Sequence, residues 1–195
     1  GTDAGRTDAG EPDAGEFDAG QPCDSIDPLD GGLIVAADHT WTWVDVAGAV
    51  CRNGSAAGFG VRTNPASDRL LIVLGGGGLC FNAISCTTNS ATFGSTQFNS
   101  WKTTSGTAGV FDDTNAANPM REWNVVYVPL CTGDGHAGST AGVNVPGTQT
   151  PQNQSFVGAT NLGLMLSRIV PSFPNVTRVV FAGTSDGFWT DQGLV

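Results

Sequence analysis

The sequence predicts an α/β fold with a mostly parallel central sheet and an N-terminal antiparallel meander. Two apolar, β-branched runs, residues 70–74 and 177–182, each lead into glycines, as buried strands of parallel sheets do. Residues 156–170 carry apolar side chains three and four positions apart, which is typical of an amphipathic helix. This helix lies between residues 123–129, a further apolar run, and residues 177–182, so the order strand–helix–strand favours parallel strands.

The first 30 residues differ in composition from the rest. An Asp-Ala-Gly unit recurs every five residues from Asp3 to Asp18, and residues 1–30 hold nine acids against one base, a net charge of −8. Such a segment buries little apolar area, so we expect residues 1–30 to be a disordered acidic linker and residues 38–195 to form the domain. Calcium binding by the repeated carboxylates is disfavoured because the ligand spacing of a known calcium loop is missing.

The charge and the cysteines limit the partners and the compartment. Residues 31–195 hold nine acids against seven bases, and this near-neutral composition without a basic patch argues against a nucleic-acid partner. Five cysteines indicate an oxidising compartment. The pairing is open; we favour Cys80–Cys86, six residues apart, and Cys51–Cys131, which leaves Cys23 over.

The meander is predicted from residues 41–62. Residues 41–46 alternate bulky and polar side chains, as a half-buried strand does. Residues 51–55 contain Asn-Gly and predict a turn, residues 58–62 form the return strand, and Asn64-Pro65 ends it.

After residue 87, the connections between the predicted strands are expected to be loops and one well-defined helix. Residues 87–118 are rich in Thr, Ser, Asn and Gly and predict a long surface excursion, with a short helical turn near residues 98–101. Residues 139–154 predict a polar loop or hairpin. The helix at 156–170 is expected to be capped by Ser155 and ended by the prolines at 171 and 174.

Residues 183–187, Gly-Thr-Ser-Asp-Gly, match the Gly-x-Ser-x-Gly pattern of a nucleophile elbow, in which a strand-to-helix turn exposes a serine hydroxyl. A plain turn after a strand fits the same five residues. The four glycines at 75–78, which also follow a buried strand, strengthen the elbow reading because their N–H groups can approach an oxygen closely. Together the two segments predict an oxyanion hole beside Ser185.

Four segments resemble the pectin acetylesterase / Notum family of α/β-hydrolases, in that family's order and spacing. They are residues 76–82, 118–129, 131–138 and 183–185, and the resemblance covers roughly residues 40–185, the N-terminal half of such a domain. It implies an incomplete α/β-hydrolase-like three-layer sandwich. It also implies a secreted serine esterase that removes acetyl or acyl groups from polysaccharides or related acylated small molecules, with no metal and no other cofactor.

The Asp-Ala-Gly repeat resembles the tails of bacterial envelope lipoproteins. This resemblance implies a bacterial protein outside the cytoplasm, secreted or anchored in the cell envelope. A membrane tether through a lipidated residue upstream of Gly1 is the form of attachment that it suggests.

Carried over by position, the resemblance implies Ser185 as the nucleophile. The backbone N–H groups of Gly77, Gly78 and Asp186 would form the oxyanion hole. Asp134 and His136 match a loop at the pocket rim, not the family's catalytic triad. Use of His136 as the base, oriented by Asp134, is disfavoured because side chains two residues apart rarely meet in that geometry.

The sequence departs from the family after the nucleophile. The family continues with small residues where this chain has Asp186, Phe188 and Trp189, and a carboxylate beside the nucleophile opposes a developing oxyanion. The family's catalytic Asp and His lie further downstream. We therefore expect this chain to be a weak or inactive esterase. The alternative is a non-catalytic envelope or carbohydrate-binding lipoprotein that keeps the hydrolase fold.

Overall fold

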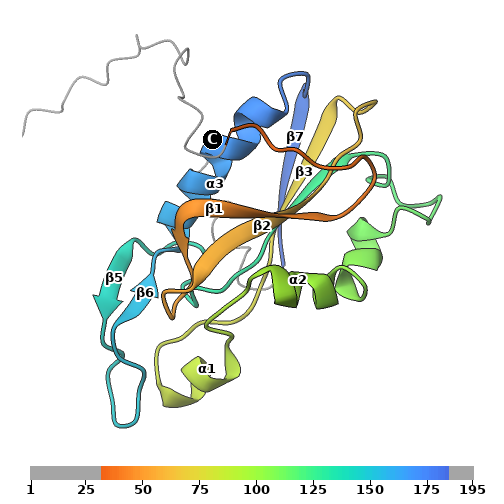
Figure 1. Cartoon of the computed structure of the whole chain (residues 1–195). Coiled ribbons are helices and arrows are strands. Elements are labelled where there is room, and N and C mark those ends of the chain that lie inside the picture. The colour runs from red at the N-terminus through yellow and green to blue at the C-terminus, as the bar shows by residue number, and fades with distance from the viewer. Residues whose placement is uncertain (1–31, 185–195) are drawn as a thin grey trace, which may run out of the picture.

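The computed structural model describes residues 32–184. These residues form an α/β arrangement around a five-stranded sheet (Figure 1). In sheet order the strands are β1 (Thr42–Val50), β2 (Ala56–Arg62), β4 (Asn124–Val128), β3 (Arg69–Leu74) and β7 (Arg178–Gly183). The predicted linker at residues 1–30 lies outside the described residues, so the proposed domain boundary stays a prediction.

The sheet is mixed, whereas the sequence predicted a mostly parallel one. The β1–β2 and β2–β4 pairs are antiparallel, and the β4–β3 and β3–β7 pairs are parallel. The antiparallel meander is confirmed, but it joins the parallel strands in one continuous sheet instead of preceding a separate core. The parallel pair expected between the strands before and after the long helix is not formed: β4 and β7 run in the same direction, but each pairs with β3, which lies between them.

The other elements lie around this sheet. They are α1 (Ala83–Thr88), α2 (Ser95–Trp101), the 3-10 turns η1 (Ser105–Thr107) and η2 (Gly109–Phe111), the strands β5 (Thr140–Val143) and β6 (Gln154–Phe156), and α3 (Gly158–Ser172). The hairpin alternative for residues 139–154 is confirmed, because β5 and β6 pair antiparallel. Pro171 does not end α3, which continues for one more residue.

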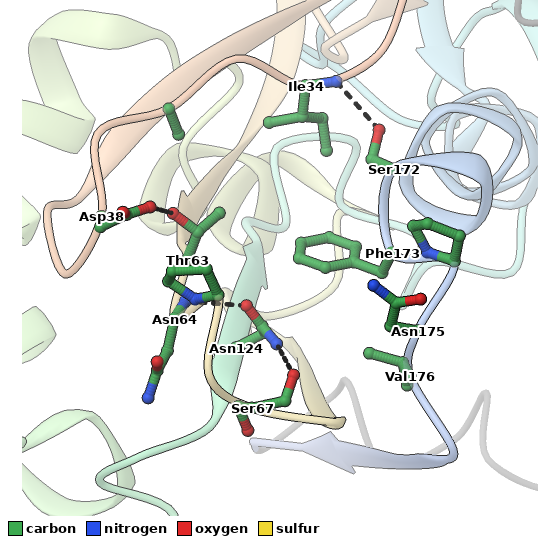
Figure 2. A pocket seen from close by; sticks show the side chains of 13 residues that line it. Ile34, Asp38, Thr63, Asn64, Ser67, Asn124, Ser172, Phe173, Asn175 and Val176 are labelled. Atoms are coloured by element: carbon green, nitrogen blue, oxygen red, sulfur yellow. Dashed lines mark hydrogen bonds between the residues drawn. The ribbon is translucent and has the colours of Figure 1, made fainter.

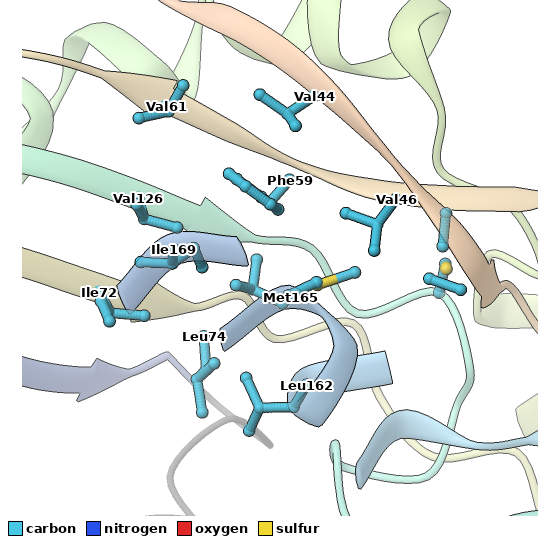
Figure 3. Packing of buried hydrophobic residues seen from close by; sticks show 14 of the residues in the cluster. Val44, Val46, Phe59, Val61, Ile72, Leu74, Val126, Leu162, Met165 and Ile169 are labelled. Carbon is cyan, nitrogen blue, oxygen red and sulfur yellow. The ribbon is translucent and has the colours of Figure 1, made fainter. Parts of the chain in front are cut away.

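One face of the sheet packs against α3. Leu70, Ile72 and Leu74 alternate along β3 and point to the same face, as the period of a strand requires. They join a cluster with Met165 and Ile169 of α3, and Figure 3 shows both of these side chains over the sheet. Burial of this apolar surface is the main force that attaches the helix to the sheet.

The opposite face carries an aromatic layer. Leu71 and Val73 of β3 point into it, together with Tyr127 of β4. The ring of Trp101, at the end of α2, stacks on Tyr127 with 3.9 Å between ring centroids. Phe111 of η2 meets Tyr127 edge-on. These contacts explain why the segment predicted as a surface excursion contains α2 and two 3-10 turns: its few large aromatics are buried against the sheet.

The packing of α3 predicts that replacing a side chain by alanine destabilises the protein more at a buried position of the helix than at an exposed one. Met165 is 2% exposed, and Met165→Ala should lower the free energy of unfolding by about 2–5 kcal/mol because it leaves a cavity against the sheet. Val170 on the same helix is 56% exposed, so Val170→Ala should change it by less than about 0.5 kcal/mol. Urea denaturation measures both, and equal losses would contradict this packing of α3.

Tyr127 predicts a loss of stability in alkali. Burial raises the pKa of Tyr127 to about 12, whereas an unfolded tyrosine ionises near pH ~10. The stabilisation is therefore complete below about pH 10, and the free energy of unfolding should fall by about 2 kcal/mol as the pH rises from about 10 to 12.

Tyr127 is the single tyrosine of the chain, so its absorbance near ~295 nm reports its titration directly. Tyr127→Phe should remove the alkaline loss of stability. A native titration midpoint near pH ~10 would show that the ring is not buried as described.

Candidate active site

The carboxyl ends of β3 and β7 lie side by side. Their register pairs Leu74 with Gly183, so the segments that follow the two strands leave the sheet at the same edge (Figure 1). The N–H of Thr184 donates to the carbonyl of Leu74 at 3.0 Å, and the N–H of Gly76 donates to Oγ1 of Thr184 at 2.9 Å. The side chain of Thr184 thus connects the end of β7 to residues 75–78, which we call the glycine loop.

Ser185 and Asp186, the predicted nucleophile and third oxyanion donor, lie outside the described residues, and their roles stay predictions. The structure reaches the residue before them. Thr184, the last described residue, is bonded to Gly76 and so contacts the glycine loop. The glycine loop was expected to lie next to the end of β7, and it does so as far as Thr184.

The glycine loop is shaped by close approach. A Cβ on Gly75 would lie 2.6 Å from the Tyr127 hydroxyl, and Gly78 has a φ of +80° with Oδ1 of Asn89 in the space that a Cβ would occupy. The N–H groups of Gly75 and Gly76 are bonded to Val128 and Thr184. Within residues 32–184, no acceptor takes the N–H of Gly77 or Gly78. Two adjacent N–H groups that are left unbonded by this part of the chain are what an oxyanion hole requires.

His136 supports the glycine loop from inside the protein. Its side chain is 3% exposed, and its Nε2 lies 2.9 Å from the carbonyl of Gly75. A carbonyl oxygen only accepts, so Nε2 carries the hydrogen of this bond. The contact gives His136 a structural role at the base of the loop. Its predicted place at a pocket rim is not tested by this contact.

Asp134 fixes the loop that contains His136 and caps α3. Its Oδ1 accepts from Oγ1 of Thr132 at 2.6 Å and from the backbone N–H of His136 at 3.0 Å. Its Oδ2 accepts from the N–H of Gly158 at 2.7 Å, in the first turn of the helix. A carboxylate there also interacts favourably with the helix dipole. The predicted rim residue therefore holds the loop to the helix.

The prediction that Ser155 caps α3 is wrong. Ser155 lies in β6, and its N–H donates to the carbonyl of Arg52 at 2.9 Å. The residue at the N-cap position is Val157, which cannot cap with its side chain. The cap comes instead from Asp134, 24 residues away, and no local sequence pattern could reveal it.

Both predicted disulfides are confirmed. Cys51–Cys131 joins the β1–β2 turn to the segment after β4, and Cys80–Cys86 joins the end of the glycine loop to α1. Cys23 lies outside the described residues. The two bonds hold the loops at the carboxyl ends of β3 and β4, and they are typical of proteins from oxidising compartments.

Two residues that surround the glycine loop were missed by sequence reasoning. Thr184 was read only as the variable residue of the elbow pattern, yet it binds Gly76. Arg52 was read only as part of a turn, yet its buried guanidinium contacts the segment that follows the loop. Thr184 occupies a position of the elbow pattern that any residue can fill, and Arg52 belongs to no motif; an arginine in a turn rich in small residues was the available signal for Arg52.

A cavity of about 290 Å³ opens at the amino ends of the strands, away from the glycine loop (Figure 2). Asn124, the first residue of β4, lines it, but its amide is occupied by bonds to Asn64, Ser67 and Arg69. Phe173 at the end of α3 faces the same space. The cavity is therefore separate from the candidate active site.

Residues 32–184 contain neither a cluster of metal-ligating side chains nor a membrane-spanning helix. Nowhere in this range do three or more His, Cys, Asp or Glu side chains gather as a metal site requires. None of its helices has the length and apolar character needed to cross a bilayer.

Comparisons with known proteins give a consistent family. A family model described as pectinacetylesterase matches residues 35–190. The palmitoleoyl-protein carboxylesterase NOTUM of Drosophila melanogaster is 29% identical over 124 residues, which cover 62% of this chain and 18% of that protein. The palmitoleoyl-protein carboxylesterase notum2 of Xenopus laevis is 27% identical over 141 residues, covering 70% and 27%.

Two further matches differ in kind. The inactive palmitoleoyl-protein carboxylesterase notum1b of Danio rerio is 30% identical over 107 residues, covering 53% of this chain and 76% of that protein. A solved structure of the Wnt deacylase Notum from Drosophila matches with a TM-score of 0.49 and 20% identity, covering 74% of this chain and 43% of the other. This chain spans about a quarter or less of the Drosophila and Xenopus relatives.

The cap of α3 predicts which of two substitutions destabilises the protein. Asp134→Ala removes the acceptor for the Gly158 N–H and should lower the free energy of unfolding by about 0.5–2 kcal/mol. Ser155→Ala, at the position favoured by the sequence, should change it by less than about 0.5 kcal/mol. Thermal denaturation of both variants decides the assignment; a larger loss for Ser155→Ala would reverse it.

Proposed function

Because the chain belongs to the pectin acetylesterase / Notum family, we propose that it is a serine ester hydrolase that removes acetyl or acyl groups from polysaccharides or related esters. The observation that carries the proposal is the hydrogen bond between Gly76 and Thr184, which brings the glycine loop to the residue before Ser185. The carboxylesterase names of the relatives agree with this reaction class. The α/β-hydrolase arrangement of layers is part of the same proposal.

The proposed reaction begins with attack of the Ser185 hydroxyl on the ester carbonyl carbon, while a base takes the hydroxyl proton. The carbonyl oxygen becomes an oxyanion, held by the N–H groups of Gly77, Gly78 and Asp186. Collapse of this intermediate breaks the ester bond, and the alcohol leaves with the proton. Water then hydrolyses the acyl-serine and releases the acid.

Of the groups that this reaction needs, the base is the one for which residues 1–195 offer the poorest candidates. Their two histidines are His39 and His136. His39 is exposed before β1, and Nε2 of His136 donates to Gly75. Removal of a triad base costs several orders of magnitude in rate. We therefore expect weak ester hydrolysis from the 195-residue polypeptide, and we propose that the full activity of the family needs an Asp and a His beyond Ser185.

Exposed apolar side chains beside the glycine loop support an acylated substrate. Leu79 and Phe81 directly follow the loop, Ile84 lies on α1, and all three are exposed. An acyl group bound to the oxyanion hole would lie against such a surface, and a sugar ring could stack on Phe81. We propose that this surface contacts the substrate beside the reacting carbonyl.

A second candidate function is a non-catalytic envelope protein that keeps the fold and binds carbohydrate. One observation favours it: this chain covers most of a relative that is named as inactive. The carboxylate of Asp186 beside the nucleophile agrees with it. Under either candidate we propose an extracytoplasmic bacterial protein, tethered through a lipidated N-terminus, with the acidic repeat as the spacer.

Hydrolysis of p-nitrophenyl acetate separates the two candidates. The wild-type chain should release p-nitrophenol above the buffer rate, and Ser185→Ala should abolish that excess because the nucleophile is gone. Ser155→Ala is the matched control and should keep the wild-type rate. Equal rates for wild type and Ser185→Ala would exclude the esterase, and retention on an acetylated polysaccharide column would then favour the binding protein.

A further inference from the structure

Arg52 is a buried cation with no carboxylate partner among residues 32–184. It lies in the turn between β1 and β2 and is 2% exposed. In the part of the chain that the structure describes, the ion pairs involve Arg62, Arg69 and Arg121, and no Asp or Glu oxygen lies within 4.0 Å of Arg52. A buried charge is costly unless hydrogen bonds replace its hydration. Burial also lowers the pKa of Arg52.

The guanidinium of Arg52 is hydrogen-bonded to the segment that follows the glycine loop. Its Nη1 lies 3.0 Å from Sγ of Cys80, and its Nη2 donates to the carbonyls of Cys86 at 2.9 Å and Asn89 at 2.8 Å. A weaker bond joins Nη1 to the side chain of Gln154 at 3.3 Å. Three of the four partners therefore lie within residues 80–89.

Asn89 connects Arg52 to the glycine loop. Its Nδ2 donates to the carbonyls of Leu79 at 2.7 Å and Ser85 at 2.6 Å, and its Oδ1 fills the space beside Gly78. Through Sγ of Cys80, which is bonded to Cys86, Arg52 also contacts the backbone two residues after the same loop. One side chain thus fixes the loop through a sulfur atom and through an asparagine.

We propose that Arg52 is a positioning residue for the glycine loop: it holds the N–H groups of Gly77 and Gly78 in the orientation that binds an oxyanion, and its uncompensated charge stabilises that oxyanion from behind. The catalytic consequence rests on the proposed ester hydrolysis; the structural consequence does not. The interior screens charges poorly, so an unpaired guanidinium there acts on a developing anion more strongly than a surface arginine does.

Arg62 provides a matched control. It is also buried, at 4% exposed, and it is the last residue of β2. It donates to the carbonyl of Phe111 at 2.8 Å, and a carboxylate oxygen of Asp113 lies 3.1 Å away. Arg62 therefore carries a similar burial cost but is neutralised by a carboxylate and contacts the aromatic layer, not the glycine loop.

The kinetic test compares Arg52→Gln, Arg52→Lys, Arg62→Gln and Arg62→Lys in the full chain, with p-nitrophenyl acetate and rates corrected for the folded fraction. Arg52→Gln should lower kcat roughly 10- to 100-fold with KM within about twofold, because a misplaced donor affects the transition state more than binding. Arg52→Lys keeps the charge and should recover part of kcat. The Arg62 variants should keep wild-type kcat. A wild-type kcat in Arg52→Gln, or an equal loss in Arg62→Gln, overturns the proposal.

A second readout keeps the proposal separate from the fate of the esterase. ¹⁵N order parameters of the Gly77 and Gly78 amides should fall from near ~0.85 in the wild type to below ~0.6 in Arg52→Gln, and stay high in Arg62→Gln. If the wild type hydrolyses no ester, the proposed function fails while this measurement still decides the positioning role. Unchanged order parameters in Arg52→Gln overturn it. If Arg52→Gln does not fold, Arg52→Lys is measured in its place, with a smaller fall expected.

Discussion

The parallel pairing of β3 with β7 is the constraint on which the candidate site depends. It aligns Leu74 with Gly183, and the bonds of Thr184 to Leu74 and Gly76 continue the alignment one residue past the sheet. Parallel neighbours deliver their carboxyl ends to the same edge, so segments about a hundred positions apart in sequence meet there. Without this register the glycines would be an ordinary loop and the residues after β7 an ordinary turn.

The two faces of the sheet support that edge differently. The face under α3 is mainly aliphatic and holds the helix whose first turn is capped by Asp134, so it fixes the loop that contains His136. The aromatic face places the Tyr127 hydroxyl where a side chain at Gly75 would have to lie. A glycine there is required by packing. Packing of the core and the shape of the glycine loop are therefore coupled.

The sequence predicted the features that depend on local pattern. Continuous apolar runs located β3, β4 and β7, alternation located β1, and the six-residue spacing indicated the Cys80–Cys86 disulfide, whereas no local pattern supported the favoured Cys51–Cys131 pairing. The prediction from sequence failed where the role of a residue depends on a partner that is distant in the sequence. Ser155 looks like a helix cap, but Asp134 reaches the helix from another loop. The mixed sheet was missed because pattern does not show that β2 pairs with β4. Arg52 has no local signature, since its partners come together only in the folded chain.

Arg52 and Arg62 show how the same buried cation is accommodated in two ways near the two ends of β2. Arg62 has a carboxylate beside it and the ring of Trp41 at 5.2 Å, so its charge is balanced in the aromatic layer. Among residues 32–184, the partners of Arg52 are carbonyls, a side-chain amide and a disulfide sulfur. A carboxylate next to Arg52 would reduce the cost of burial, but it would also cancel the positive potential behind the glycine loop. An unbalanced cation is unfavourable for stability alone and favourable where a negative charge has to form, and the partners of Arg52 lie in the segment that directly follows the glycine loop.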